Sequence, residues 1–330
     1  MSDRAWSVGL TALGFAGLAL LPALIPSFYA SLLAFTFTYV IAAVGVNLLT
    51  GYTGLVTVGH GGFFAIGAYT TALMGQHLGT SVLPGLVAGA LSSGFIGFAL
   101  GIICLRLGGA FLAIATLGFA LAVGAILNNW PIFEGREGIK LGKNTLLGFS
   151  IQDVGFYYVS LIVMALVMLA SWSIVRSAVG RAFIAMRDSE RAAQAMGINL
   201  RLYKTVSFAI SASMTGIAGV LFAHHNRYVS TETFGDAWLS VDFLTAVVVG
   251  GQASLFGSAL GAAFVVLVPY YLGTLRDFAY ILNGVALIAV LRFAPAGVAG
   301  VLAHWWRFLL ARARRRTAAA REPLRVERVS

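Results

Sequence analysis

Few polar side chains interrupt this largely apolar chain, and they are the first candidates for chemistry. Among them are an amide, a phenol, an imidazole, a hydroxyl and a carboxylate, on Asn47, Tyr52, His60, Thr116 and Asp242. Groups of this kind inside apolar segments are typical of a path for a solute or an ion. No further His, Cys or acidic residue stands beside them at metal-ligand spacing, so we expect no metal site. The five residues are therefore candidates for lining a translocation path.

The sequence motifs of enzymes are missing. The stretch from Gly138 to Gly142-Lys143 is one residue too short for a phosphate-binding loop, and Asn144 follows the lysine. A nucleophile elbow, an HExxH zinc motif and the paired acids of isoprenoid-handling enzymes are also absent from the sequence. The single cysteine, Cys104, excludes an intramolecular disulfide and a CxxC site. We expect a chain that is not an enzyme, does not hydrolyse ATP by itself and needs no cofactor.

Glycines are dense between residues 50 and 70. They stand at positions 51, 54, 59, 61, 62 and 67. Glycine permits backbone conformations that interrupt a helix, and transporters use interrupted helices to present backbone groups to a solute. Close packing of small residues explains any single glycine equally well. The stretch as a whole predicts a broken helix beside a path.

Residues 176–204 are too charged to cross a membrane, yet they have helical character. Asp188 is placed to cap a short helix, and Gly197 is placed to end it in a left-handed conformation. Five residues share one face of that helix: Phe183, Met186, Glu190, Ala193 and Gly197. Alanines anchor poorly in lipid, so this small-residue face with one acid favours docking into a partner's groove over lying on the membrane surface.

Residues 240–261 contain an acid at the start of an apolar segment. Asp242 either caps the helix that begins there or faces an aqueous path, and its position at the predicted start favours the cap. Gly250-Gly251, followed by Gly257, predicts a tight hinge between two apolar helices.

The composition predicts that the helices positioning these residues lie in a membrane. Hydrophobic residues are 59% of the 330 and charged residues 10%, and the mean hydropathy is +0.89, which excludes an ordinary soluble domain. A helix spans the hydrocarbon core with about 20 apolar residues. Apolar stretches lie at 6–26, 29–50, 55–75, 82–104, 109–128, 155–175, 205–225, 240–252, 255–272 and 276–292. We predict an all-α, polytopic transmembrane helix bundle of about 8–10 helices over residues 1–303, in which the short 240–252 stretch is broken or re-entrant.

The positive charges predict the orientation of the bundle. Six Lys and Arg lie in 176–204 and eight Arg lie in 304–330, out of 22 in the chain. The positive-inside rule assigns both stretches to the cytoplasm, so residues 304–330 are expected to form a basic cytoplasmic tail. Ten crossings place both termini in the cytoplasm and the loop 129–154, whose charges cancel, outside. The basic charge indicates lipid headgroups rather than nucleic acid, because the tail lacks interleaved aromatic residues.

Several separated motifs resemble one known family. The stretch from Glu190 to Ile198 resembles the EAA-type coupling loop of bacterial ABC importer permeases. More closely, the chain is similar to LivM-type permeases of the branched-chain (hydrophobic) amino acid uptake family, from about residue 36 to 302. The motifs that carry this likeness are 47–60, 67–69, 111–118, 180–187, 192–204, 240–242, 249–251, 254–257 and 292–297.

The resemblance implies an assembly in the bacterial inner membrane. It comprises a second, LivH-like permease subunit, two cytoplasmic ABC ATPases and a periplasmic solute-binding protein. The residues that this likeness assigns to ATPase coupling are Arg187, Glu190, Ala192, Ala193, Met196 and Gly197. The expected function is ATP-driven import of branched-chain or other hydrophobic amino acids.

One departure from the family leaves the solute open. Members of this family commonly have a Thr-Gly-Gly-x-x-Gly stretch after the fifth helix, where this chain has Phe133-Glu-Gly-Arg-Glu-Gly138. Close relatives handle urea and short amides, so a urea or amide importer is the alternative. A self-contained secondary transporter is a weaker alternative, because no intramembrane ionisable residue has an obvious partner. A heterodimer of two permeases is implied, and a homodimer stays open.

Overall fold

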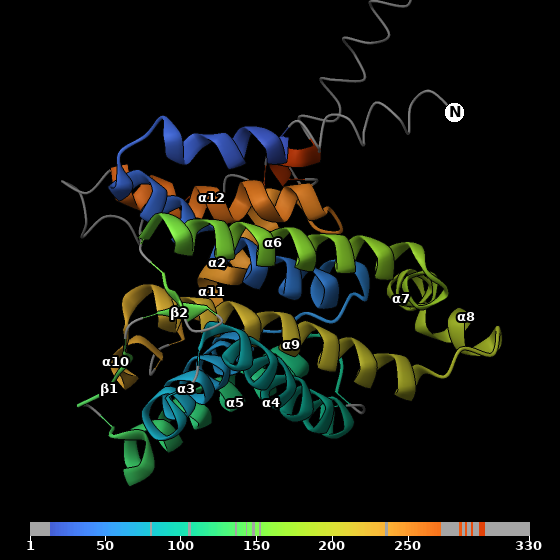
Figure 1. Cartoon of the computed structure of the whole chain (residues 1–330). Coiled ribbons are helices and arrows are strands. Elements are labelled where there is room, and N and C mark those ends of the chain that lie inside the picture. The colour runs from blue at the N-terminus through green and yellow to red at the C-terminus, as the bar shows by residue number, and fades with distance from the viewer. Residues whose placement is uncertain are drawn as a thin grey trace, which may run out of the picture.

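The chain folds almost entirely into helices, and α6, α9 and α12 run along one common direction (Figure 1). The computed structural model describes residues 14–79, 81–104, 107–135, 137–142, 144–146, 149–151, 153–234, 237–271, 284, 285, 288, 292 and 297–300. Its strands are two-residue pairs. β1 (Ile139–Lys140) pairs antiparallel with β4 (Tyr228–Val229), and β2 (Thr145–Leu146) with β3 (Phe149–Ser150). The predicted all-α bundle is confirmed.

Five helices of the described chain are long and apolar enough to cross a membrane. They are Ser27–Tyr52, which comprises α2 (Ser27–Asn47) and the π-helical η2 (Leu48–Tyr52), then α4 (Val82–Ile103), α5 (Ala110–Asn129), α6 (Asp153–Arg176) and α9 (Leu200–Asn226). Other apolar helices are Gly14–Ala23, which ends in η1 (Leu21–Ala23), α3 (His60–Leu78), α11 (Trp238–Gly250) and α12 (Leu255–Tyr271). The predicted apolar stretches from 29 to 272 each coincide with one of these helices. The stretch 276–292 falls mostly, and the tail 304–330 wholly, outside the described residues.

Two groups of helices lie one above the other in Figure 1. In one group α2 packs against α6 and α12, and in the other α9 packs against α3 and α4. The two groups meet where α2 crosses α9. Small residues permit the closest approaches. A Cβ on Gly97 of α4 would lie 2.9 Å from the Phe208 carbonyl oxygen of α9, which leaves no room for a side chain.

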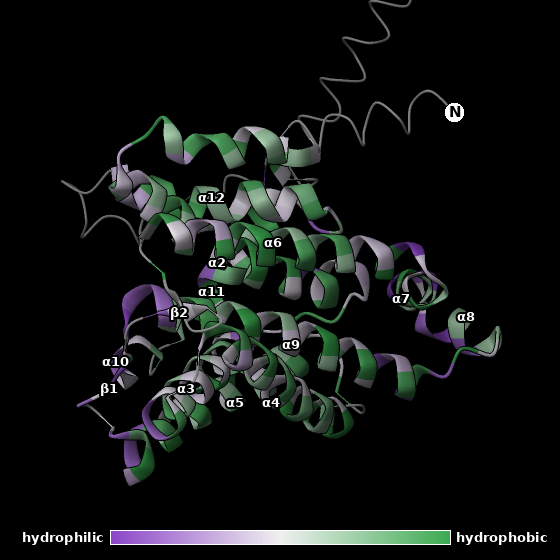
Figure 2. Cartoon of the chain, in the orientation of Figure 1, coloured by the Kyte–Doolittle hydropathy of each residue, from purple (hydrophilic) through white to green (hydrophobic). Residues whose placement is uncertain are grey.

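Polar residues gather at the two ends of the bundle, and apolar residues lie between them (Figure 2). One end carries α7 (Ala178–Asp188) and α8 (Glu190–Ala195). The other carries β1, β4, η4 (Pro131–Phe133) and α10 (Thr231–Phe234). Large apolar side chains are exposed between the ends, among them Phe95 and Phe111. This distribution is that of a protein whose middle faces lipid, and the loops 129–154 and 176–204 lie at opposite ends, as predicted.

The helices α11 and α12 form a hairpin with a tight turn at Gly250 and Gly251, as the sequence predicts. A Cβ on Gly257 would lie 2.6 Å from the Gly250 carbonyl oxygen, so the two helices touch through their backbones. α11 follows α10 directly, and Tyr270 near the end of α12 packs on Phe28 at the start of α2. Both arms therefore open toward the end of the bundle that carries the strands, and the turn points into the bundle.

Two predicted caps are wrong. α11 begins at Trp238 with Ala237 before it, so Asp242 lies inside the helix and caps nothing. The helix predicted across 183–197 is two helices, and Asp188 is the last residue of the first. The Ser189 hydroxyl caps the second by accepting a hydrogen bond from the Ala192 amide at 3.3 Å. Serine favours this position as strongly as aspartate, so local sequence did not separate the two.

Candidate functional site

The helix break predicted between residues 50 and 70 is present. α2 widens into the π-helical turn η2, residues 54–59 are non-helical, and α3 begins at His60. Gly54 has φ +74°, a conformation that glycine adopts without strain. The Leu55 amide donates to the Leu49 carbonyl at 3.2 Å, which folds the chain back on the helix it leaves. The break leaves backbone groups that no helix satisfies.

Hydroxyl groups of neighbouring helices hold this non-helical segment. The Val58 amide donates to the Thr116 hydroxyl of α5 at 3.1 Å, and the Gly61 amide donates to the Ser240 hydroxyl of α11 at 2.9 Å. Thr116 itself donates to the Ala113 carbonyl at 3.0 Å. Hydrogen bonds to the Thr116 and Ser240 hydroxyls therefore fix the broken helix between α5 and α11.

His60 opens α3 and is fully buried. Its Nε2 lies 2.6 Å from the Ser211 hydroxyl of α9, and that hydroxyl donates to the Gly45 carbonyl of α2 at 2.6 Å. The single hydroxyl proton of Ser211 is donated to the Gly45 carbonyl, so in the contact between His60 and Ser211 the proton must come from His60 Nε2. His60 Nδ1 is then a buried acceptor with no partner among the described residues. The two hydrogen bonds of the Ser211 hydroxyl therefore join α2, α3 and α9 at one point.

Asn47 fastens the turn between α11 and α12. Its side-chain amide donates to the Ser254 carbonyl at 2.9 Å and to the Ser258 hydroxyl at 2.7 Å, while its oxygen accepts from the Ala253 amide at 2.9 Å. The residue is fully buried. Its amide protons are thus both used within the protein, and Asn47 holds the turn beside the end of α2.

The remaining path candidates lie near this region. Tyr52 is buried at the end of η2, and Asp242 is half-buried on α11, directly before the buried Phe243. No hydrogen bond joins any two of Asn47, Tyr52, His60, Thr116 and Asp242 in the described part of the chain. The structure gathers the first four around the helix break and sets Asp242 on the neighbouring helix.

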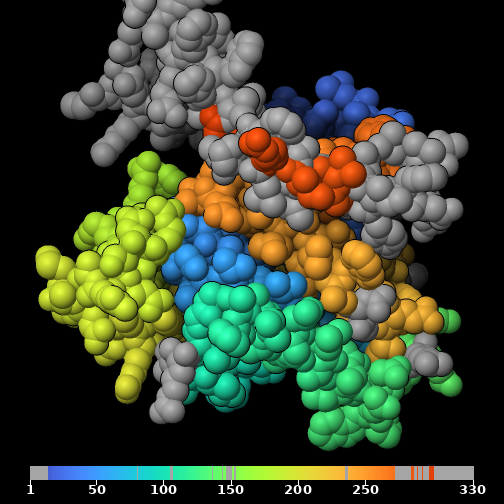
Figure 3. Space-filling model, turned by 180° about the vertical axis from the view of Figure 1, so that it is seen from behind, coloured from blue at the N-terminus to red at the C-terminus, as the bar shows by residue number. Residues whose placement is uncertain are grey.

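The non-helical segment reaches the surface of the isolated chain. Figure 3 shows residues near 50–60 in blue, with α11 and α12 on one side and α5 on another. Gly54 and Val56 are exposed there. Irregular backbone at membrane depth is stable only against protein or water. This broken-helix face, defined by residues 53–59, of which Gly54 and Val56 are exposed, is therefore a poor surface for lipid.

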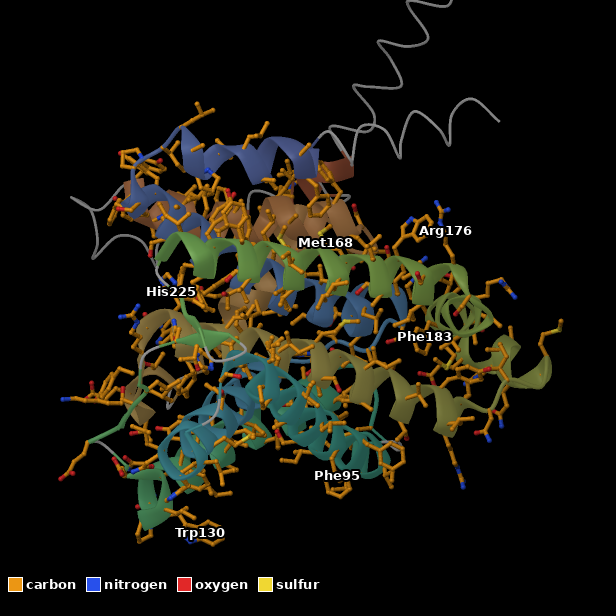
Figure 4. All side chains as sticks on the ribbon, in the orientation of Figure 1. Phe95, Trp130, Met168, Arg176, Phe183 and His225 are labelled. Atoms are coloured by element: carbon orange, nitrogen blue, oxygen red, sulfur yellow. The ribbon has the colours of Figure 1, made fainter. Side chains whose placement is uncertain are left out.

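At the α7 end the chain builds a small helical platform. The Ser177 hydroxyl caps α7 by accepting from the Val179 amide at 3.2 Å. Phe183, Met186 and Ala193 are buried together with Leu48 of η2. In Figure 4 Phe183 and Arg176 lie at this end of the molecule, whereas Trp130 lies near the other. The platform thus packs directly on the end of the broken helix.

The other residues assigned to coupling face outward or bind the chain itself. Met196 is 84% exposed, Ala192 is exposed, and Gly197 has φ +84°, which ends the turn after α8 as predicted. Glu190 and Lys204 form an ion pair at 2.8 Å on the wall of a cavity of about 460 Å³. The outer side of α8 is exposed.

Arg187 connects the platform to the broken helix. Its Nη1 donates to the Gly51 carbonyl of η2 at 3.2 Å, and its Nη2 donates to Asp188 Oδ1 at 3.2 Å. The sequence pointed to Arg187 but gave no partner within the chain, because 136 residues separate Arg187 from Gly51.

Sequence reasoning missed Ser211, Ser240 and Lys204. One signal was available: Ser207, Ser211 and Thr215 recur every four residues and give the apolar α9 one polar stripe. Nothing in the local sequence marked Ser240 or Lys204.

Comparison with known proteins gives a consistent result. The chain matches, over residues 28–291, the protein family described as the permease component of branched-chain amino acid transport systems. It is 33% identical over 289 residues to the high-affinity branched-chain amino acid transport system permease protein LivM of Escherichia coli K12, covering 80% of this chain and 68% of the relative. It is 25% identical over 298 residues to the autoinducer 2 import system permease protein LsrC of E. coli O9:H4, covering 84% and 83%. No solved structure matches significantly.

Proposed function

Because the chain belongs to the family of permease components of branched-chain amino acid transport systems, we propose that it forms part of the translocation path of an ATP-driven importer of hydrophobic amino acids. The observation that carries this proposal is the broken-helix face, where non-helical backbone is exposed at Gly54 and Val56 while the buried hydroxyls of Thr116 and Ser240 hold the segment from behind. Such a surface suits a path.

A second permease subunit covers the broken-helix face in this proposal. A partner supplies the protein or water that the non-helical backbone needs at the exposed Gly54 and Val56. The path then runs between two chains, beside the buried Tyr52, His60 and Thr116 and the half-buried Asp242, with Asn47 holding the turn. A LivH-like partner and a second copy of this chain are distinguished by what co-purifies with it.

One of the two cytoplasmic ATPases binds the platform of α7 and α8, and the other binds the second permease subunit. The exposed Ala192, Met196 and Gly197 offer a small, shallow surface that fits a groove. In this proposal the chain lies in a bacterial inner membrane, with the loop 176–204 and both termini on the cytoplasmic side. The opposite end, with β1 and β4, then receives a periplasmic binding protein that supplies the solute.

Gly197→Leu tests the docking surface. Nothing lies within 4 Å of a Cβ on Gly197, but its φ of +84° is strained for leucine and a bulky side chain there obstructs a groove. We expect uptake and ATPase co-purification to fall while membrane insertion persists. Gly79→Leu, also unobstructed and in a left-handed conformation (φ +59°) but at the end of α3, is the matched control. Normal uptake in Gly197→Leu contradicts docking at this surface.

The solute is tested through the assembled complex. Affinity purification of the chain from native membranes is expected to recover a second permease and Walker-motif ATPases, and the associated binding protein is titrated with leucine, isoleucine, valine and urea. The likeness to LsrC adds the autoinducer 2 class as a second candidate. Recovery of this chain alone favours a secondary transporter instead.

A further inference from the structure

Three separate parts of the chain meet at residues 47–54. The platform reaches them through Arg187, which donates to the Gly51 carbonyl at 3.2 Å. The turn between α11 and α12 reaches them through Asn47, whose side chain bonds Ala253 and Ser254 at 2.9 Å each. The broken helix itself lies between these two contacts.

Gly51 is the centre of this junction. A Cβ on Gly51 would lie 2.5 Å from the Ala253 amide nitrogen, so its backbone is pressed against the α11–α12 turn. Its carbonyl stands where η2 ends, and carbonyls at a helix end need donors from outside the helix. Arg187 supplies that donor from the platform. Gly51 thus contacts the α11–α12 turn through its backbone and accepts a hydrogen bond from the platform through its carbonyl.

We propose that Arg187 is the positioning residue through which the α7–α8 platform moves the broken helix and the α11–α12 turn as one unit. The inference rests on the proposed function, because only an ATPase-driven platform has a movement to transmit. Arg187 touches no solute in this account. It acts through the Gly51 carbonyl, and Asn47 carries the movement onward to the turn.

The chemistry of the side chain suits this role. Nε and Nη2 of Arg187 both donate to Asp188 Oδ1, at 3.3 and 3.2 Å, which orients the planar guanidinium so that Nη1 faces Gly51. The Arg187 stem also packs on Gly54, where a Cβ would lie 3.0 Å from Arg187 Cγ. Lysine cannot donate to both groups in this fixed geometry, so Arg187→Lys breaks the link while keeping the charge.

The first experiment separates transmission from stability. The complete transporter is reconstituted in proteoliposomes, and leucine uptake and ATP hydrolysis are measured together. In Arg187→Lys and Arg187→Gln we expect uptake per ATP to fall about tenfold, as the loss of one charged hydrogen bond allows, with the complex assembled and hydrolysis retained. Arg181→Gln, on the same helix and bonded only to the Arg176 carbonyl in the described chain, is the control.

The second experiment restores the link covalently. A Cβ on Gly54 would lie 3.4 Å from Arg187 Cβ, close to the roughly 3.5–4.5 Å of disulfides. Gly54→Cys with Arg187→Cys is made with Cys104→Ala, which removes the native thiol. We expect uptake per ATP to be low in the double-cysteine variant when its thiols are reduced, and to recover when they are oxidised to the disulfide. The single variants, oxidised in the same way, are the controls.

The outcomes are distinct. Normal uptake per ATP in both Arg187 variants overturns the inference, as does a disulfide that fails to form, or one that forms without restoring uptake. A wild-type complex with no ATP-dependent uptake instead defeats the proposed function, whatever the variants do.

Discussion

The Lys204 ammonium lies 2.8 Å from the Glu190 carboxylate, and this ion pair joins α8 to the start of α9. Glu190 therefore binds its own chain rather than pointing wholly outward. From Lys204, α9 continues through Ser211, which meets His60, to His224, which bonds Thr71 and Asn144 at 3.0 Å each. One helix connects the platform to the helix break and to the far end of the bundle.

Exchange of the two charges tests this pair. Glu190→Lys places two ammonium groups together, and we expect uptake to fall about fivefold, because a pair with a half-exposed carboxylate contributes about 1 kcal/mol at most. Glu190→Lys combined with Lys204→Glu is expected to recover most of the uptake. A double variant no better than the single one shows that Glu190 acts elsewhere.

Ser211→Ala is expected to destabilise the fold. It removes one of the donors to the Gly45 carbonyl and leaves the buried His60 Nε2 proton without a partner, which costs about 1–3 kcal/mol for a buried polar group. Thermal unfolding in detergent measures the loss. Ser213→Ala is the control, since Ser213 is half-buried on the same helix and makes no hydrogen bond within the described residues. Equal melting temperatures for the two variants argue against the Ser211 junction.

Thr116→Val is expected to loosen the non-helical segment without changing its bulk. The Val58 amide loses its acceptor at 3.1 Å, so hydrogen exchange of residues 54–59 should rise about fivefold, corresponding to about 1 kcal/mol. Thr36→Val removes a hydroxyl bonded only to Leu32 of its own helix and serves as the control. Unchanged exchange in Thr116→Val means that α5 does not hold the segment.

Gly97→Val is expected to separate α4 from α9. Its Cβ would stand 2.9 Å from the Phe208 carbonyl, a backbone atom that cannot turn aside, and overpacking of this kind costs about 1–3 kcal/mol. The yield of folded, detergent-stable protein reports the effect. Gly118→Val meets nothing within 4 Å and should fold normally; similar yields from both contradict the close packing.

Local sequence predicted what depends on local chemistry. Long apolar runs located α2, α4, α5, α6 and α9, and the glycines around Gly54 located the helix break, because hydropathy and backbone freedom belong to the segment itself. The apolar stretch 240–252 was likewise predicted to be short, as α11 is, because its length is read directly from the hydropathy of the segment. Caps were less certain, since Asp188, Ser189 and Asp242 are all plausible caps by residue type.

Contacts between distant segments were beyond local sequence. Asn47 was identified as a polar residue and a candidate for the path, but its partners in the α11–α12 turn stand more than 200 residues away. His60 and Ser211 are separated by 151 residues. Periodicity gives the face of a helix on which a residue lies, not the residue that faces it. The roles of these contacts in transport stay predictions.

ATP-dependent uptake tests the central claim most directly. The chain is reconstituted with its co-purifying permease and ATPases, binding protein is added outside, and ATP is enclosed with the ATPase domains. We predict uptake of labelled leucine, isoleucine or valine that requires both ATP and binding protein and is unaffected when ion gradients are collapsed. Uptake that follows an ion gradient and persists without ATP contradicts the account.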